Sequence, residues 1–188
     1  MDVGTGSGCI IISLAKTLFA YSRELENSYF ASDISTSALT VAKKNARTHK
    51  IHISFKQSDL LTAWKGQKFD IIVANLPYLA RETDPSTKFE PKKALFAKNK
   101  GLAIYEKFFR QISSLRGVRS SDRTTKQSQT LQVFVEIGHD QAAKIKKLAT
   151  KFLPDYECQI FKDLANRDRY AYLAPQARAS KAKAQARG

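Results

Sequence analysis

Three glycines at alternate positions near the start of the chain constrain its fold more than any other feature. Gly4, Gly6 and Gly8 follow the apolar Val3 and precede the apolar run that begins at Ile10. Glycine is favoured where a backbone turns sharply or approaches another group closely, because a Cβ atom would obstruct the approach. The pattern predicts an elbow between a strand and a helix, which is typical of α/β domains. A tight turn that binds no ligand is the alternative interpretation.

Beyond the elbow, apolar segments of strand length alternate with segments of helical period. Strands are expected over 28–33, 51–55, 69–74 and 131–137, with a closing antiparallel pair over 157–161 and 170–173. Four helical stripes lie between or beside them: Ile11, Leu14, Ala15 and Leu18; Leu39, Ala42 and Ala46; Tyr105, Phe108, Phe109 and Ile112; and Ile145, Leu148, Ala149 and Phe152. This alternation predicts an α/β fold with a doubly wound, mostly parallel sheet, covered on both faces and ending in antiparallel strands.

The chain begins unusually close to the elbow. Only three residues precede Gly4, whereas a strand in such a sheet averages about 5 to 6 residues. We therefore expect a first strand that is largely missing, because the chain is a fragment or its start has been placed too late. One domain is expected over 1–175, with a polar, mobile insertion at about 113–130 and a basic, disordered tail over 176–188.

Composition narrows the classes of function. The chain has 188 residues, 43% of them hydrophobic, and a formal net charge of +15. That charge favours weak, nonspecific contact with nucleic acid or the ribosome, although a solvated tail supplies part of it. Two distant cysteines and the lack of any apolar span of about 18 residues indicate a reducing, cytoplasmic location away from membranes. The histidines and cysteines show no metal-ligand spacing, so no metal is expected.

Acidic residues stand beside the elbow and after two of the expected strands. Asp2 can face an ammonium group, and Asp33, which ends the second strand, is placed to accept hydrogen bonds from ribose hydroxyls. Asp59 can meet the exocyclic amine of adenine while Leu60 packs against the ring. For each, a strand-end residue that only caps a turn is the alternative. Candidate cofactor-binding residues are Asp2, Gly4, Thr5, Gly6, Gly8, Asp33, Ile34, Asp59, Leu60 and Asn75.

The most chemically specific motif ends the central strand near position 74. It consists of Asn75, Leu76, Pro77 and Tyr78, the candidate catalytic residues. The Asn75 side-chain oxygen and the Leu76 carbonyl, turned inward by Pro77, can accept the N–H groups of a planar nitrogen and stabilise positive charge that develops on it. Tyr78 offers a face to the planar group. An ordinary strand-ending turn is the alternative.

Elbow and motif together resemble the class I, Rossmann-like methyltransferases that use S-adenosyl-L-methionine. More specifically, residues 2 to 173 are similar to the HemK/PrmC type of glutamine N5-methyltransferase. Further residues carry that resemblance: Phe89-Glu90-Pro91, Ala94-Leu95, Gly101, Val135-Glu136-Ile137-Gly138-His139, Gln141, Lys162-Asp163-Leu164 and Arg169. The resemblance implies a peptide chain release factor as partner, methylated on the glutamine of its Gly-Gly-Gln motif. The family usually has proline at position 76 and a further N-terminal helical domain.

Two other functions remain open. Asn75 to Tyr78 also resembles the motif of ribosomal RNA adenine dimethylases, so an adenine N6-methyltransferase acting on RNA or DNA is the first alternative. The segment from Phe89 to Gly101 favours the glutamine enzymes. A non-catalytic fragment that binds the cofactor or RNA is the second alternative, suggested by the short first strand.

Overall fold

A seven-stranded sheet organises the part of the chain that the computed structural model describes, residues 1–21, 27–77, 102–116 and 131–176. Its strands are β1 (Asp2–Val3), β2 (Phe30–Asp33), β3 (Ser54–Gln57), β4 (Ile71–Ala74), β5 (Gln132–Glu136), β6 (Tyr156–Lys162) and β7 (Asp168–Pro175), in the order β3-β2-β1-β4-β5-β7-β6. The first five strands pair in parallel, and β7 runs antiparallel between β5 and β6. The predicted mostly parallel sheet with an antiparallel end is confirmed.

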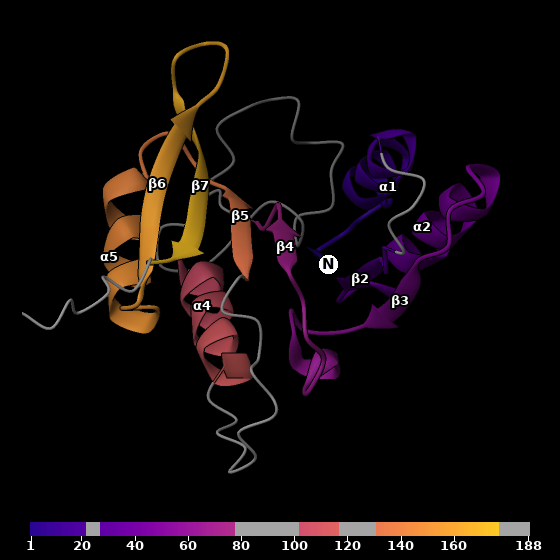
Figure 1. Cartoon of the computed structure of the whole chain (residues 1–188), viewed down its shortest axis with the longest axis horizontal. Helices are drawn as coiled ribbons and strands as arrows, with labels where there is room; N and C mark the ends of the chain where they lie inside the picture. Colours follow the sequence, from indigo (N-terminus) through magenta and orange to yellow (C-terminus); the bar gives the residue numbers. More distant parts are fainter. Residues whose placement is uncertain (22–26, 78–101, 117–130, 177–188) are drawn as a thin grey trace, which may run out of the picture.

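Helices accompany both halves of the sheet. They are α1 (Cys9–Tyr21), α2 (Thr36–Thr48), α4 (Ala103–Arg116) and α5 (Ala142–Phe152), with a short 3-10 turn η1 (Thr62–Trp64). Figure 1 shows α1 and α2 beside the β1–β3 half, and α4 and α5 beside the β5–β7 half. The buried apolar residues form two separate clusters, one that includes α1 and α2 side chains and one that includes α4 and α5 side chains. The parallel strands run outward from β1 in both directions, so right-handed crossovers place the helices of the two halves on opposite faces, and the predicted doubly wound arrangement is confirmed.

The shortest strand of the described sheet, β1, lies in its interior. Asp2 and Val3 pair with β2 on one side and with β4 on the other. The carbonyl of Met1 extends this ladder by accepting from Val73 N at 2.9 Å, and the Met1 amino group donates to Ile71 O at 2.9 Å. Burial lowers the pKa of that amino group to about 6. Met1 therefore binds the neighbouring strand β4 through both its amino group and its carbonyl.

Local sequence signals explain α2 and α4. Ser35 caps α2 in an extended conformation, and its hydroxyl accepts a hydrogen bond from Ala38 N at 3.2 Å. The predicted stripes are buried as expected on both helices: Leu39, Ala42 and Ala46 on α2, and Tyr105, Phe108, Phe109 and Ile112 on α4.

Two sequence predictions are wrong in detail. The strand expected over 51–55 lies later, because Ile51 N bonds Ala46 O as the chain leaves α2, and pairing with β2 begins only at Ser54. On α1, Ile11 and Ala15 are buried, but Leu14 and Leu18 are exposed. The third buried residue of α1 is Ile12, so the buried face is rotated relative to the predicted stripe.

The predicted boundaries of the insertion and the tail also change. Residues 113–116 belong to the last turn of α4, where Ser114 Oγ donates to Arg110 O at 2.9 Å. Gln176 is tied to the fold, since its backbone N–H donates to Asp155 O at 2.8 Å. The remaining parts of both segments, 117–130 and 177–188, lie outside the described residues.

We expect stability to rise with pH between 6 and 8. The Met1 amino group has a pKa lowered from 8.0 to about 6 in the fold, so the unfolded chain binds more protons in that window. The free energy of unfolding should therefore increase by about 2 kcal/mol across it. Thermal unfolding at each pH measures this. A chain extended by Ser-Val before Met1 has an amide there and should lack this rise; an equal rise in both proteins would contradict the prediction.

Candidate functional site

The glycine elbow packs against α2 and the end of β4. Gly8 has a φ of +85°, and a Cβ there would lie 3.1 Å from Ile12 Cδ1 and 3.2 Å from Ala42 Cβ. Gly4 has a φ of +73°, and a Cβ there would lie 3.4 Å from Leu76 Cδ2. The elbow therefore needs glycine at Gly8 for helix packing and at Gly4 for the left-handed turn.

Asp33 joins the elbow to the start of α2. Its Oδ2 accepts from Gly6 N at 2.9 Å, and its Oδ1 accepts from Ser35 N at 2.8 Å. Both oxygens keep further acceptor capacity, because an ionised carboxylate has about four lone-pair sites. The carboxylate is partly exposed at the carboxyl end of β2, beside the exposed side chain of Ile34. The two predicted cofactor-binding residues of this strand end thus lie next to the elbow.

Asp2 is a buried carboxylate under the elbow. Thr5 Oγ1 donates to its Oδ2 at 2.6 Å, whereas its Oδ1 is buried and accepts no hydrogen bond from the described residues. Burial raises the pKa of Asp2 above its usual range, against the opposing effects of Thr5, the amino terminus and the nearby Ile11 N–H. A buried acceptor without a partner is costly, so Asp2 is suited to a cationic or N–H donor ligand.

Asn45 is an elbow residue that sequence reasoning missed. Its side-chain amide, on α2, donates to the Ser7 carbonyl at 2.9 Å, across 38 positions of sequence. The available signal is a poor helix former next to the buried face, since Asn45 directly precedes the buried Ala46. Asn45 therefore fixes the elbow from the helix behind it.

The end of β4 meets the elbow from the other side. Asn75 is exposed and Leu76 is buried, and a Cβ on Gly4 would be 3.6 Å from the Asn75 carbonyl oxygen. The structure therefore brings Asn75 and Leu76 together with the elbow, as the alignment of parallel strand ends predicts, and Pro77 follows them in the chain. Tyr78 lies outside the described residues.

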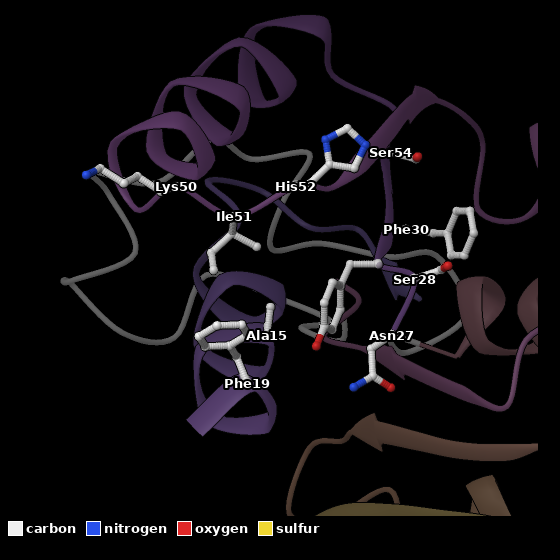
Figure 2. Close-up of a pocket in the computed structure, with 10 residues that line it drawn as sticks. Ala15, Phe19, Asn27, Ser28, Phe30, Lys50, Ile51, His52 and Ser54 are labelled. Atoms are coloured by element: carbon white, nitrogen blue, oxygen red, sulfur yellow. The ribbon is translucent and has the colours of Figure 1, made fainter. Parts of the chain in front are cut away.

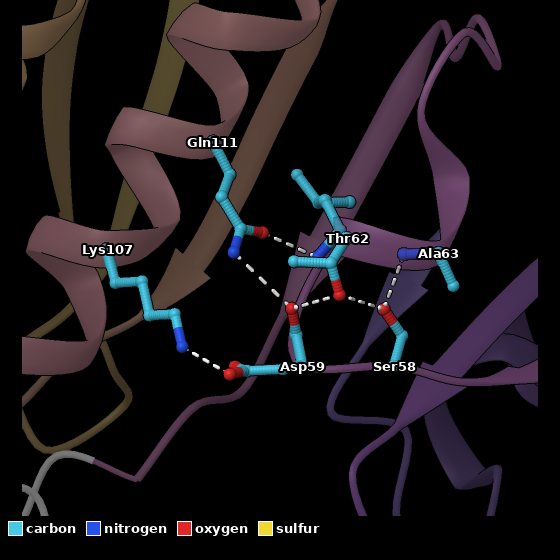
Figure 3. A network of polar contacts seen from close by, with 7 residues as sticks. Ser58, Asp59, Thr62, Ala63, Lys107 and Gln111 are labelled. Carbon is cyan, nitrogen blue, oxygen red and sulfur yellow. Dashed lines mark hydrogen bonds and ion pairs between the residues drawn. The ribbon is translucent and has the colours of Figure 1, made fainter.

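The loop after β3 is held by a dense polar network, shown in Figure 3. The Ser58 hydroxyl accepts from Ala63 N at 3.0 Å, and Thr62 Oγ1 donates to Asp59 O at 3.1 Å. Two α4 residues that sequence reasoning missed complete the network: Lys107 pairs with the Asp59 carboxylate, and Gln111 accepts from Leu61 N at 2.7 Å. Neither has a sequence signal, because both are common polar residues far from the loop in sequence.

A second polar cluster lies at the carboxyl end of β5, next to β4. Gln141 Oε1 accepts from Gly138 N at 3.0 Å, and a Cβ on Gly138 would lie 3.2 Å from that same atom. Arg169 contacts Asp163 Oδ2 at 3.3 Å and Glu136 Oε1 at 3.8 Å. These contacts involve four of the sequence elements that carry the resemblance: residues 135–139, Gln141, residues 162–164 and Arg169. Residues 89–91, 94–95 and 101 lie outside the described part.

With this geometry established, comparison with known proteins decides the family. A family profile described as "Methyltransferase domain" matches residues 1–152, about four-fifths of the chain. The chain belongs to this methyltransferase domain family.

Several curated relatives carry the description "Release factor glutamine methyltransferase". The protein of that name from Lactococcus lactis is 37% identical over 174 residues, which cover 90% of this chain and 58% of the relative. The one from Bacillus subtilis is 36% identical over 179 residues, covering 90% and 55%. The chain thus spans little more than half the length of these relatives.

Solved structures show the same fold. A ribosomal protein L11 methylase from Lactobacillus delbrueckii subsp. bulgaricus superimposes with a TM-score of 0.59 at 24% identity, covering 94% of this chain and 69% of that one. At this identity the likeness supports the fold alone. In the described part of the methyltransferase domain, no helix is long and apolar enough to cross a membrane.

A pocket of about 420 Å³ lies away from the elbow (Figure 2). It is lined by the end of α1, including Phe19, by the approach to β2, and by Lys50, Ile51 and His52 before β3. Parallel strands β2 and β3 begin there, so the pocket is at the opposite edge of the sheet from Asp33 and Asp59. It therefore does not belong to the candidate site of the methyltransferase domain.

Substitution by alanine should separate two of the elbow glycines. Gly6→Ala and Gly8→Ala both strain a left-handed backbone, at a cost of about 1 to 2 kcal/mol each. Only Gly8→Ala also overlaps Ile12 and Ala42, whereas a Cβ on Gly6 meets nothing within 4 Å. Gly8→Ala should therefore lower the free energy of unfolding by roughly a further 1 to 3 kcal/mol. Urea unfolding compares the two variants, and equal losses would refute the packing argument.

Proposed function

We propose that this chain is the catalytic domain of an S-adenosyl-L-methionine-dependent enzyme that methylates the glutamine side-chain amide in the Gly-Gly-Gln motif of a peptide chain release factor. The observation that carries the proposal is the meeting of the elbow with Asn75 and Leu76 at the end of β4. The curated relatives support the choice of substrate, because their name states that reaction.

The residues around the elbow fit the cofactor. The orphaned Oδ1 of Asp2 suits the ammonium group of the methionine moiety, and the N-terminus of α1 suits its carboxylate. Asp33 would accept from the ribose hydroxyls, and Asp59 from the exocyclic amine of adenine. The exposed apolar side chain of Ile34 suits the flat face of the base. When bound, the cofactor supplies an electrophilic methyl group.

Asn75 and Leu76, which follow β4, would orient the nucleophilic amide nitrogen of the substrate glutamine. An amide nitrogen is a poor nucleophile because its lone pair is delocalised into the carbonyl. The Asn75 side-chain oxygen and the Leu76 carbonyl would accept its two N–H bonds, which fixes the lone-pair direction and favours a pyramidal nitrogen. The same oxygens would stabilise positive charge on the nitrogen in the transition state. Proton loss to water then completes the reaction, so no general base is needed.

Location and charge fit a partner of the translation apparatus. We place the domain in the cytoplasm, where such release factors act. The formal net charge of +15 should add weak, nonspecific contact with nucleic acid or the ribosome, and this contact should fall steeply with salt. Such binding would not by itself indicate methylation of RNA.

The substrate is tested by methyl transfer from a tritiated cofactor. We expect label on a release factor with an intact Gly-Gly-Gln motif. A release factor whose glutamine is changed to alanine is the matched control and should remain unlabelled, as should ribosomal RNA and DNA. Label on adenine with none on the release factor would overturn the proposal in favour of an adenine N6-methyltransferase. Cofactor binding without label on any of these substrates would favour the non-catalytic alternative.

Two substitutions should separate catalysis from cofactor binding. Asn75→Ala should lower turnover by roughly 100-fold or more and leave cofactor affinity nearly unchanged, because Asn75 acts on the substrate nitrogen near its transition state. Asp33→Ala should weaken cofactor binding by about 1 to 3 kcal/mol, since charged acceptors for two hydroxyls are lost. Calorimetry with S-adenosylhomocysteine and single-turnover rates measure both effects. Parallel losses of affinity and rate in Asn75→Ala would identify Asn75 as a structural residue instead.

A further inference from the structure

The loop that would read the adenine base contains a strained residue. Leu60 has a φ of +57°, in the left-handed region that a leucine rarely adopts, and it is only 6% exposed. Backbone strain of this kind persists when the surroundings hold it in place, and it concentrates at ligand-binding positions. The groups that hold Leu60 therefore bear on how the loop presents its side chains.

Gln111 forms hydrogen bonds with the backbone on both sides of Leu60. Its Oε1 accepts from Leu61 N at 2.7 Å, and its Nε2 donates to Asp59 O at 3.4 Å. Ser32 Oγ donates to the carbonyl of Leu60 itself at 3.1 Å. The peptide groups that flank the strained residue are thus bound by one side chain of α4, 50 positions away in sequence.

Lys107 forms an ion pair with Asp59, the residue that precedes Leu60. It lies one turn before Gln111 on the same face of α4, and its ammonium pairs with Oδ2 of Asp59 (Figure 3). Both side chains are about half exposed, at 50% and 44%, so the pair contributes little to stability. Its consequence is geometric: among the described residues no hydrogen bond reaches Oδ1, which is left as an oriented acceptor.

We propose that Lys107 and Gln111 are positioning residues that hold the loop 58–62 so that the Asp59 carboxylate selects adenine by its exocyclic amine. The inference rests on the proposed function and assigns base specificity to a helix outside the elbow. A carboxylate only accepts hydrogen bonds, so a fixed Asp59 favours the amine of adenine and disfavours the oxygen at the same position of hypoxanthine.

The test compares two ligands that differ at this position, S-adenosylhomocysteine and S-inosylhomocysteine. Calorimetry on the full chain gives both dissociation constants, and their ratio measures discrimination. We expect Lys107→Met and Gln111→Leu each to reduce that ratio about tenfold. Lys147→Met removes the same charge from an exposed position on α5 and should leave the ratio unchanged. Equal weakening of both ligands in the α4 variants would show a merely structural role and overturn the inference.

Asp59→Asn separates this inference from the function on which it rests. An asparagine side chain both donates and accepts hydrogen bonds, so it can pair with either base. The ratio of the two dissociation constants should therefore fall at least as far in Asp59→Asn as in Lys107→Met. An unchanged ratio in Asp59→Asn would overturn the assignment of Asp59 to adenine, and the positioning role with it. A normal chain that binds neither ligand would overturn the proposed cofactor. A reduced ratio in Asp59→Asn alone would overturn only the roles of Lys107 and Gln111.

A double-mutant cycle tests the grip on Leu60 even if a single variant is unstable. Glycine adopts the left-handed region without strain, so Gln111 should matter less in a Leu60→Gly background. We expect Gln111→Leu to weaken S-adenosylhomocysteine binding several-fold less in that background than in the normal chain. Additive losses in the two backgrounds would show that Gln111 does not act through Leu60.

Discussion

The arrangement of the site depends on the parallel pairing of a two-residue strand, β1, with β2 and β4. Because the three strands run in the same direction and in register, their carboxyl ends lie at the same end of the sheet. The elbow after β1, Asp33 at the end of β2 and Asn75 after β4 all lie at that end of the sheet. The pairing thus converts three separate sequence signals into one constellation, and the close approach of Gly4 to the Asn75 carbonyl is its direct result.

Features with a local physical cause could be predicted from the sequence. The elbow follows from its glycines, the start of α2 from the Ser35 cap, and the antiparallel end from two short strand-like runs. The position of β3 could not, because the apolar Ile51 and Ile53 pack near α2 while pairing begins at Ser54. The exposed Leu14 and Leu18 show the same limit. The spacing of apolar residues predicts that one face of α1 is buried, but packing against the rest of the fold decides which residues lie on that face.

The parts of the site that escaped prediction are long-range contacts between ordinary polar residues. Asn45 reaches Ser7 across 38 positions, and Lys107 reaches Asp59 across 48. Asn45 has only a weak signal, a poor helix former beside the buried Ala46, and Lys107 has none, because charged and amide residues are common on helix surfaces. The positions of Asp33 and Asp59 could be predicted, because the ends of apolar, strand-like runs are visible in the sequence. The polar groups that bind these residues could not be predicted.

The sheet order has a consequence for how the domain behaves among other copies of itself. Closing the sheet with β7 between β5 and β6 leaves β3 and β6 as its two edges. Edge strands offer unpaired peptide groups to other chains and so invite aggregation. Here β3 is only four residues long and carries the exposed, charged Lys56, and β6 is irregular at Phe161 and Lys162. The shortness of β3 and the irregular end of β6 both disfavour the addition of a strand from another copy of the chain.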